Sequence, residues 1–264
     1  MRVHVTGAGG FIGRHLVPAL ERAGHEVRPA VSGAQAVVHL AGIAHRRAGS
    51  EELQEVNVRL AERVAREAAG AGARLIFMSS VKVHGDDSDH PLTEGSRLAP
   101  ADEYARSKAT AEAVLRSVAG LQLTVLRPPL VYGPHVKANF FALMKAIARG
   151  IPLPLASVQN RRSFVYVGNL ADAIVRCLAE PRALGRTYLV SDGAPLSTPA
   201  LCRAIGAALG RPARLFPFPA RFLPGPLGRS LELDDRALRT ELGWRPPFAV
   251  EQALRATADW YRSR

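Results

Sequence analysis

Residues 3–13 read Val3-His4-Val5-Thr6-Gly7-Ala8-Gly9-Gly10-Phe11-Ile12-Gly13, and this stretch decides the fold. A short apolar strand runs into three glycines spaced three residues apart, and an amphipathic helix follows to about Arg22. The first glycine permits a tight turn, the second lets backbone approach a pyrophosphate, and the third lets the helix pack close to the strand. Amide groups at the start of such a helix attract negative charge. The pattern predicts a dinucleotide site rather than a purely structural turn, because a strand precedes it and a helix follows.

The run from Thr6 to Gly13 resembles the extended short-chain dehydrogenase/reductase family, also described as NAD-dependent epimerases and dehydratases. Other dehydrogenases often carry the different spacing Gly-x-Gly-x-x-Gly. Members of the resembled family mostly act on nucleotide sugars. The resemblance implies an α/β fold with a Rossmann-type parallel sheet, a small α/β C-terminal substrate lobe and NAD(P) as cofactor.

Length and composition restrict the class of protein. The 264 residues, 47% of them hydrophobic, fit one large domain or two small ones. No apolar run reaches the roughly 18 residues that span a bilayer, and no signal peptide is expected, so we expect a cytoplasmic protein with no membrane partner. The net charge is +12, but the arginines are scattered and only 6% of residues are aromatic, so we expect no nucleic-acid partner. Cys177 and Cys202 are expected to be buried thiols, and no histidine spacing suggests a metal site.

One crossover is missing after the second strand. Residues 25–31 read as that strand, and residues 35–42 resemble the family's fourth strand and its turn. Only residues 32–34 intervene, whereas a parallel crossover needs a dozen or more residues. The sequence therefore predicts a sheet shortened by one crossover, with Pro29 on an exposed edge. The alternative is that residues 25–35 form no regular strand.

The other elements follow from apolar periodicity. Helices are expected at 51–69, 102–118, 140–149, 170–178 and 249–261, and strands at 74–78, 123–127, 164–167 and 187–190. Thr198 is expected to cap a further helix, with Pro199 at its first position. A proline-rich stretch follows Gly150, so we divide the chain into an NAD(P)-binding part, 1–150, and a substrate lobe, 151–264, which interleave near the C-terminus as one compact unit.

Tyr104 and Lys108 lie one turn apart on the helix expected at 102–118. A phenol is a poor base at neutral pH, and a neighbouring cation lowers its pKa. Ser79 and Ser80 end the preceding strand, and this order resembles the Ser-Tyr-Lys triad of the family. The resemblance implies the catalytic residues Ser80, Tyr104 and Lys108, with Ser79 as the alternative serine. The other interpretation is that two small residues merely end a strand.

The resemblance also implies the cofactor site. Its residues are Gly7, Gly10, Phe11, Ile12, Gly13, Ser32, Leu40, Ala41, Gly42, Asn57, Ser79, Tyr104, Lys108, Pro128 and Val131. NAD-preferring relatives end the second strand with Asp or Glu, which repels a 2′-phosphate. This chain has Val31 there, so we expect it to bind the cofactor loosely and to accept NADP(H) at least as well as NAD(H).

A substrate site follows from two further segments. Residues 133–140 open a helix, and residues 160–167 resemble the stretch that brings an arginine to the nucleotide diphosphate, where Arg pairs bidentately with phosphate. The implied substrate residues are Ser80, Lys82, Tyr104, Lys137, Asn139, Phe140 and Arg162. The alternatives are an ordinary capped helix and a solvated arginine pair. His45 and Arg46 are candidates to face the sugar, and His39 is expected to be a core residue.

Together these patterns predict an NAD(P)-dependent oxidoreductase or epimerase acting at C4 of a nucleoside-diphosphate sugar. The substrate that we expect is a UDP-linked 4-keto-6-deoxy-N-acetylhexosamine, which would be reduced at C4. The same residues would also serve a 4-epimerase of UDP-hexose or UDP-N-acetylhexosamine, so they do not separate the two reactions. The alternative is a catalytically weak nucleotide-binding sensor or an inactive partner of the same fold. A homodimer through the helices at 51–69 and 102–118 is compatible with the sequence.

Overall fold

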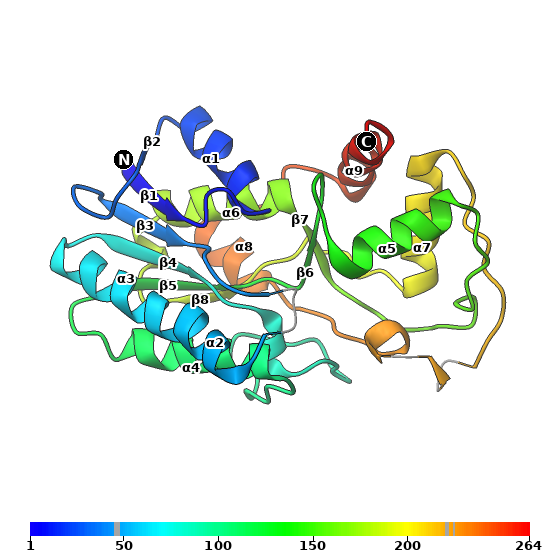
Figure 1. Ribbon diagram of the computed structural model, residues 1–264, viewed down its shortest axis with the longest axis horizontal. Coiled ribbons are helices and arrows are strands. Elements are labelled where there is room, and N and C mark those ends of the chain that lie inside the picture. The colour runs from blue at the N-terminus through cyan, green and yellow to red at the C-terminus, as the bar shows by residue number, and fades with distance from the viewer. Residues whose placement is uncertain (45–47, 220–221, 224) are drawn as a thin grey trace.

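The computed structural model describes all residues except 45–47, 220–221 and 224, and its centre is a six-stranded sheet (Figure 1). All its strand pairs are parallel, and their order is β2-β1-β3-β4-β5-β8. The strands are β1 (Arg2–Thr6), β2 (Glu26–Arg28), β3 (Ala36–His39), β4 (Arg74–Met78), β5 (Gln122–Arg127) and β8 (Thr187–Leu189). A separate parallel pair joins β6 (Leu130–Tyr132) to β7 (Phe164–Tyr166). The predicted α/β class with a Rossmann-type sheet is confirmed.

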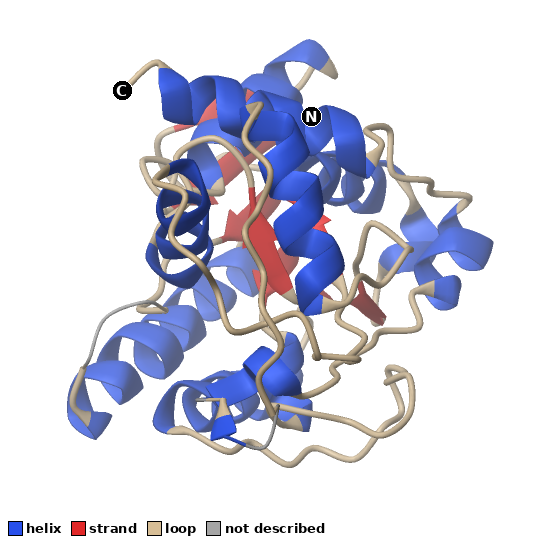
Figure 2. Cartoon of the chain, turned by 90° about the vertical axis from the view of Figure 1, so that its right-hand side faces the viewer, coloured by secondary structure: helices blue, strands red, loops and turns tan. Residues whose placement is uncertain are grey.

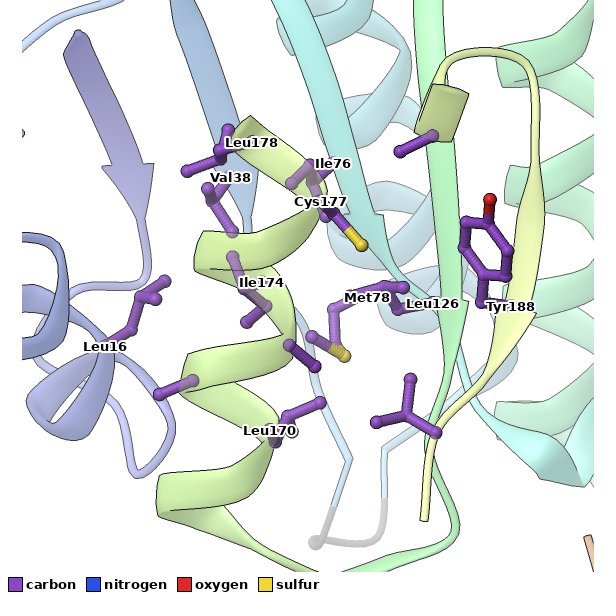
Figure 3. Packing of buried hydrophobic residues seen from close by; sticks show 14 of the residues in the cluster. Leu16, Val38, Ile76, Met78, Leu126, Leu170, Ile174, Cys177, Leu178 and Tyr188 are labelled. Carbon is purple, nitrogen blue, oxygen red and sulfur yellow. The ribbon is translucent and has the colours of Figure 1, made fainter. Parts of the chain in front are cut away.

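Helices cover both faces of the large sheet. One face carries α1 (Gly13–Arg22), α6 (Val167–Ala179) and α8 (Arg236–Leu242), and the other carries α3 (Leu60–Gly70) and α4 (Glu103–Arg116). Figure 3 shows the first face, where Leu16 and Ile174 point toward side chains of the strands. Each such buried aliphatic side chain stabilises the fold by about 1.5–3 kcal/mol. Strands that are buried on both faces read as continuous apolar runs, which explains the sequence of β3 and β4.

The helix expected at 51–69 is one helical path with a wider turn inside it. It begins as α2 (Ser50–Leu53), passes through a π-helical segment (Gln54–Arg59) and continues as α3. Asn57 lies in the π-helical segment and is buried. Its side chain accepts a hydrogen bond from the backbone amide of Ile43 at 2.8 Å and donates one to Ser107 at 2.9 Å. The widened turn therefore ties the segment after β3 to α4.

The missing crossover is confirmed. Residues 29–35 are all that connect β2 to β3, and these two strands lie on opposite sides of β1. The second strand is shorter than predicted, because it ends at Arg28, and Pro29 follows the strand rather than lying inside it. Proline has no amide hydrogen to continue a ladder. Val31 turns inward, 7% exposed, and packs in the cluster that contains Val37 and Val58.

The remaining helices α5 (Ala138–Ala148), α7 (Thr198–Leu209) and α9 (Val250–Arg262) pack around the β6–β7 pair. Figure 2 looks onto this part, with strands of the sheet behind the helices and long loops. The chain then returns to the large sheet, since α6 and β8 pack there although they follow α5 in sequence. The division at residue 150 remains a prediction. Neither β6 nor α8 was predicted from the sequence.

The predicted cap of α7 was wrong by one residue. Ser197, not Thr198, is the N-cap, and its hydroxyl accepts from the backbone amide of Ala200 at 3.2 Å. Thr198 instead donates its hydroxyl to the carbonyl of Leu227 at 3.0 Å, a contact between distant segments that the local sequence does not reveal. The other expected helices and strands are present, with ends shifted by a few residues.

We expect Gly13→Ala to lower the free energy of unfolding by about 1–3 kcal/mol, the cost of overpacking a close contact. A Cβ at Gly13 would lie 2.4 Å from the Gly7 carbonyl oxygen and 2.5 Å from that of Ala8. The matched control is Gly9→Ala, because nothing lies within 4 Å of a Cβ at Gly9. It should change stability by no more than about 0.5 kcal/mol. Equal losses for the two variants in urea unfolding would contradict this account of the glycine turn.

Candidate functional site

A cavity of about 660 Å³ opens at the carboxyl ends of β3, β4 and β5. In open parallel sheets this edge is where ligands bind. Most of the residues selected from the sequence line it: Phe11, Ile12, Leu40, Gly42, Ser79, Ser80, Lys82, Tyr104, Lys108, Pro128, Val131, Lys137, Asn139, Phe140 and Arg162. The fold therefore brings segments from the first 140 residues and the Arg162 segment to one place.

The other selected residues lie around the cavity rather than in its lining. Gly7 has a φ of +72°, and a Cβ there would lie 2.9 Å from the backbone nitrogen of Ala41. This close approach joins the glycine turn to the end of β3, and Asn57 supports the same region from behind. Ser32 is exposed in the turn after β2 and does not line the cavity.

The glycine turn fits the pyrophosphate of a dinucleotide. A Cβ on Gly10 would lie 3.1 Å from the Gly7 carbonyl oxygen, a tight contact that glycine avoids. The first amides of α1 follow directly, and Phe11 and Ile12 line the cavity. Gly7, Gly10 and Gly13 would hold the pyrophosphate, and the residues at the ends of β4 and α4 would surround the nicotinamide.

The adenosine end of such a cofactor meets a different surface. Val31, which the resemblance puts at the acidic position of NAD-preferring relatives, is buried in the core. Arg28, the nearest cation at the end of β2, pairs with Glu26 at 2.6 Å. No carboxylate therefore stands at the Val31 and Ser32 positions to accept hydrogen bonds from both ribose hydroxyls.

Tyr104 lies in the first turn of α4, at the wall of the cavity. Asp102 caps this helix by accepting from the backbone amide of Ala105 at 2.7 Å. Burial raises the pKa of the Tyr104 phenol, while a hydrogen bond with Ser80 and the charge of Lys82 act to lower it. The net effect keeps the phenol protonated at neutral pH, in the form that can donate a proton.

Lys82 is the cation that acts most directly on Tyr104. Its ammonium group forms ion pairs with Asp102 and, at 3.2 Å, with Asp86. Burial acts to lower the pKa of Lys82, but these two carboxylates outweigh it and raise the pKa. From the sequence, Lys82 was assigned to the substrate only. Its position four residues before Asp86 was a signal for the ion pair.

Lys108 also lines the cavity, and its side chain is buried. Its Nζ donates to the carbonyl of Met78 at 2.9 Å and lies 4.8 Å from the centre of the Phe77 ring. Burial lowers the pKa of Lys108 to about 8. The expected action of Lys108 on Tyr104 stays a prediction, because the charge that bears on the phenol here is that of Lys82.

A buried ion pair holds the strand ends in place. The Arg127 guanidinium makes two hydrogen bonds to the Glu112 carboxylate, at 2.9 and 2.6 Å, and Glu112 is fully buried. The Ser79 hydroxyl donates to the same carboxylate at 2.5 Å. Since Ser79 is engaged behind the strand, the geometry favours Ser80 as the serine that acts beside Tyr104. Glu112 was missed, although it lies four residues after Lys108 on the same helix.

The substrate candidates Lys137, Asn139, Phe140 and Arg162 line the same cavity. Lys137 and Asn139 are exposed at the start of α5, and Phe140 is buried against Tyr132, with 5.2 Å between the ring centres. The Arg162 guanidinium donates to the carbonyl of Arg229 at 3.0 Å. Burial lowers the pKa of Arg162, and the charges of Asp86 and Asp87 oppose that shift. His45 and Arg46 lie outside the described residues.

His39 is a core residue, as predicted. It is 1% exposed, bonds to the Thr6 hydroxyl at 2.8 Å and stacks on Phe77. Burial lowers the pKa of His39 to about 3, and the charge of Lys108 adds to the effect.

Cys177 and Cys202 are buried free thiols. Within the described ranges, no three His, Cys, Asp or Glu side chains gather so as to hold a metal ion, and no helix is long and apolar enough to cross a membrane.

Comparison with known proteins shows a match to one family and to one relative over nearly the whole chain. The model of the NAD dependent epimerase/dehydratase family matches residues 3–33 and 28–191. The two matched segments meet where the crossover is missing. The chain is 33% identical to the UDP-glucose 4-epimerase of Vibrio cholerae, over 96% of this chain and 93% of that protein. That alignment runs over 306 positions, more than the 264 residues of this chain, so the relative carries residues that this chain lacks.

Solved structures give the same fold. The UDP-glucose 4-epimerase of Thermus thermophilus, in complex with NAD, superposes with a TM-score of 0.81 at 27% identity, over 99% of both chains. RMD from Pseudomonas aeruginosa, complexed with NADPH, superposes with a TM-score of 0.81 at 22% identity, over 100% of this chain and 99% of that one. The second likeness, at this identity, concerns the fold alone.

We expect Glu112→Gln to lower the free energy of unfolding by about 3 kcal/mol, because it leaves the buried Arg127 without a counter-charge. The matched control is Glu55→Gln, since Glu55 pairs with Arg59 and Arg63 at the surface. That change should cost far less, because water and salt screen ion pairs at the surface. Urea unfolding of both variants measures the difference, and similar small losses would show that the buried pair does not hold this region together.

Proposed function

Because the chain belongs to the NAD-dependent epimerase/dehydratase family, we propose that it transfers a hydride between a nicotinamide cofactor and C4 of a nucleoside-diphosphate sugar. One observation carries the proposal: a protonated Tyr104 hydrogen-bonds Ser80 at the wall of a cavity that begins at a dinucleotide-type glycine turn. The cavity, about 660 Å³, lies in the size range of small-molecule and cofactor sites.

The chain's own residues supply the proton chemistry. When bound, the cofactor supplies or accepts the hydride. Tyr104 gives its phenolic proton to the C4 oxygen of a 4-keto sugar as that carbon is reduced, and takes the proton back in the reverse direction. Ser80 holds the same oxygen by a hydrogen bond. The charges of Lys82 and Lys108 stabilise the phenolate that remains on Tyr104.

Two cations in the lining support a diphosphate-linked substrate. Arg162 and Lys137 both line the cavity, and Arg binds phosphate oxygens bidentately. Asn139 can hydrogen-bond an acetamido group beside them. We therefore propose a UDP-linked 4-keto-6-deoxy-N-acetylhexosamine as the substrate, with the chain acting as its 4-ketoreductase.

The adenosine end favours the reductase. An epimerase must keep its reduced cofactor through the catalytic cycle, whereas a reductase exchanges its cofactor in every turnover. The buried Val31 and the short connection after β2 leave the adenosine with fewer partners, which suits exchange and acceptance of NADP(H). A 4-epimerase is the second candidate, and the 33% identity with the Vibrio cholerae enzyme favours it.

Two assays with the full chain separate the candidates. In the first, the chain is mixed with NADPH or NADH and the UDP-linked 4-keto sugar, and oxidation of the cofactor is followed by absorbance. In the second, UDP-glucose and UDP-N-acetylglucosamine are incubated with and without added cofactor, and epimers are separated by chromatography. Stoichiometric oxidation of NADPH supports the reductase. Epimer formation with tightly copurifying NAD and no binding of NADP supports the epimerase, and no turnover in either assay overturns both.

Tyr104→Phe should reduce turnover by roughly two to four orders of magnitude, because the variant lacks the proton that reaches the C4 oxygen. The matched control is Tyr261→Phe, on the last turn of α9 and outside the cavity. It should turn over like the wild type. Unchanged turnover in a folded Tyr104→Phe protein would remove Tyr104 from the mechanism.

Arg162→Ala should weaken binding of the UDP-sugar and leave cofactor binding nearly unchanged, because we assign the Arg162 guanidinium to the diphosphate of the sugar nucleotide and not to the cofactor. The neighbouring Arg161 pairs with Glu232 at 2.6 Å and does not line the cavity, so Arg161→Ala is the matched control. Calorimetric titration with UDP and with NADPH measures both affinities. Equal effects of the two substitutions on UDP binding would reject the assignment.

A further inference from the structure

Acidic residues are missing from two long stretches of the chain. Residues 113–171 and 193–231 contain no Asp or Glu, and they carry seven and five Lys or Arg residues. These stretches include α5, α7 and the loop that follows α7. Arg116 and Arg127 of the first stretch pair with Glu112, but Arg149, Arg211 and Arg214 belong to the end of α5 and the loop after α7, where no acidic residue is near in sequence.

Aromatic side chains are exposed within the same region. Phe216, Phe218 and Phe222 are 42%, 37% and 63% exposed, and the rings of Phe218 and Phe222 meet edge to face at 6.3 Å. Prolines at 217 and 219 separate them and have no amide hydrogen. In Figure 1 the loop after α7 runs along the right-hand side of the molecule, far from β2.

A second segment lies alongside this loop. The backbone amide of Leu153 donates to the carbonyl of Arg214 at 2.8 Å, and that of Phe216 donates to Leu153 at 3.0 Å. Because this pairing is parallel, with Leu153 opposite Leu215, Ile151, 46% exposed, lies beside the Arg214 end of the loop, and the phenylalanines follow farther along it. The Arg211 guanidinium donates to the carbonyl of Ala148, which brings it to the end of α5.

We name this surface the Phe–Arg patch. Its members are Arg149, Ile151, Arg211, Arg214, Phe216, Phe218 and Phe222. We propose that the Phe–Arg patch docks the protein onto an anionic lipid surface. Arginines near a bilayer are attracted to acidic headgroups, and phenylalanine and isoleucine side chains insert at the boundary between headgroups and acyl chains.

The composition of the patch favours lipid over nucleic acid. Single-stranded nucleic acid binds on aromatic rings that stack with bases, and an aliphatic side chain offers no such face. Ile151, and Leu227 at 36% exposure farther along the same loop, are aliphatic and fit an acyl boundary. The proposal departs from the expectation that no membrane takes part, which rested on the lack of a spanning segment. The docking proposed here takes place at the surface of the bilayer and needs no segment that spans it.

The patch is separate from the candidate functional site, since none of its members lines the cavity. Variants in the patch therefore test docking without altering the residues proposed for hydride transfer. If docking fails while UDP-sugar turnover is intact, only the present inference falls. If turnover fails while docking is intact, only the proposed function falls.

The first test is sedimentation of the full chain with vesicles of phosphatidylcholine alone or mixed with phosphatidylglycerol. We expect binding to the mixed vesicles, weakened by salt. Phe218→Ser together with Phe222→Ser should lower the partition coefficient by about tenfold or more. Arg149→Gln together with Arg214→Gln should lower it by about fivefold for each arginine. Circular dichroism checks that each variant is folded.

Two matched controls remove equivalent groups elsewhere. Leu98→Ser removes an apolar side chain that is 42% exposed, and Arg22→Gln with Arg63→Gln removes two charges from α1 and α3. Both should bind the mixed vesicles as the wild type does. Equal loss with the charge control would mean attraction by net charge alone and would overturn the proposal. Failure to bind mixed vesicles, or preferential binding of single-stranded RNA through the same phenylalanines, would overturn it as well.

A second measurement reports insertion directly and does not depend on loss of binding. Phe222→Trp places an indole at the most exposed ring of the patch. Of the two native tryptophans, Trp244 is buried and Trp260 is half-buried, so the emission of the wild type on the same vesicles is subtracted. We expect the fluorescence of the added indole to shift to shorter wavelength on mixed vesicles and to be quenched by brominated acyl chains. No change in emission when the variant is bound would show that the phenylalanines stay in water.

Discussion

The carboxyl end of the large sheet depends on the buried ion pair between Glu112 and Arg127. Glu112 comes from α4 and Arg127 from the end of β5, and Ser79 at the end of β4 donates to the same carboxylate. Three elements are thus held to one another by charge-assisted hydrogen bonds in a region without water to compete. Tyr104 and Ser80 face the cavity from two of these elements, so their relative position follows from a contact behind them.

Two lysines line the cavity, and their different surroundings shift their pKa values in opposite directions. Lys108 is buried, and burial lowers its pKa to about 8. Lys82 lies nearer the opening, where Asp86 and Asp102 keep it charged and raise its pKa. Burial raises the pKa of the Tyr104 phenol, and the charge of Lys82 acts against that shift, so Lys82 favours the phenolate that proton donation would leave.

The short connection after β2 shapes the opposite end of the site. Residues 29–35 replace a crossover, and the side chain among them that stands at the ribose position, Val31, is drawn into the core. The glycine turn is complete, because its geometry is set locally by Gly7 and Gly13. If the cofactor binds as we propose, its pyrophosphate would meet a complete glycine turn and its adenosine a shortened connection, which is the basis for expecting an exchangeable cofactor.

The sequence by itself determined the features that depend on neighbours in the chain. The glycine turn, the spacing of Tyr104 and Lys108, and the missing crossover are all local, and the structure contains each of them. Most of the candidate site could be predicted as well, because parallel strands bring their carboxyl ends to one edge.

The tertiary structure alone decided which groups distant in sequence contact one another. The Ser79 hydroxyl bonds to Glu112, and the Thr198 hydroxyl bonds to Leu227 while Ser197 caps α7. The loop after α7 pairs with Leu153. These pairings join residues dozens of positions apart. Their partners are selected by packing and by the need to satisfy buried polar groups, and no local pattern records that selection.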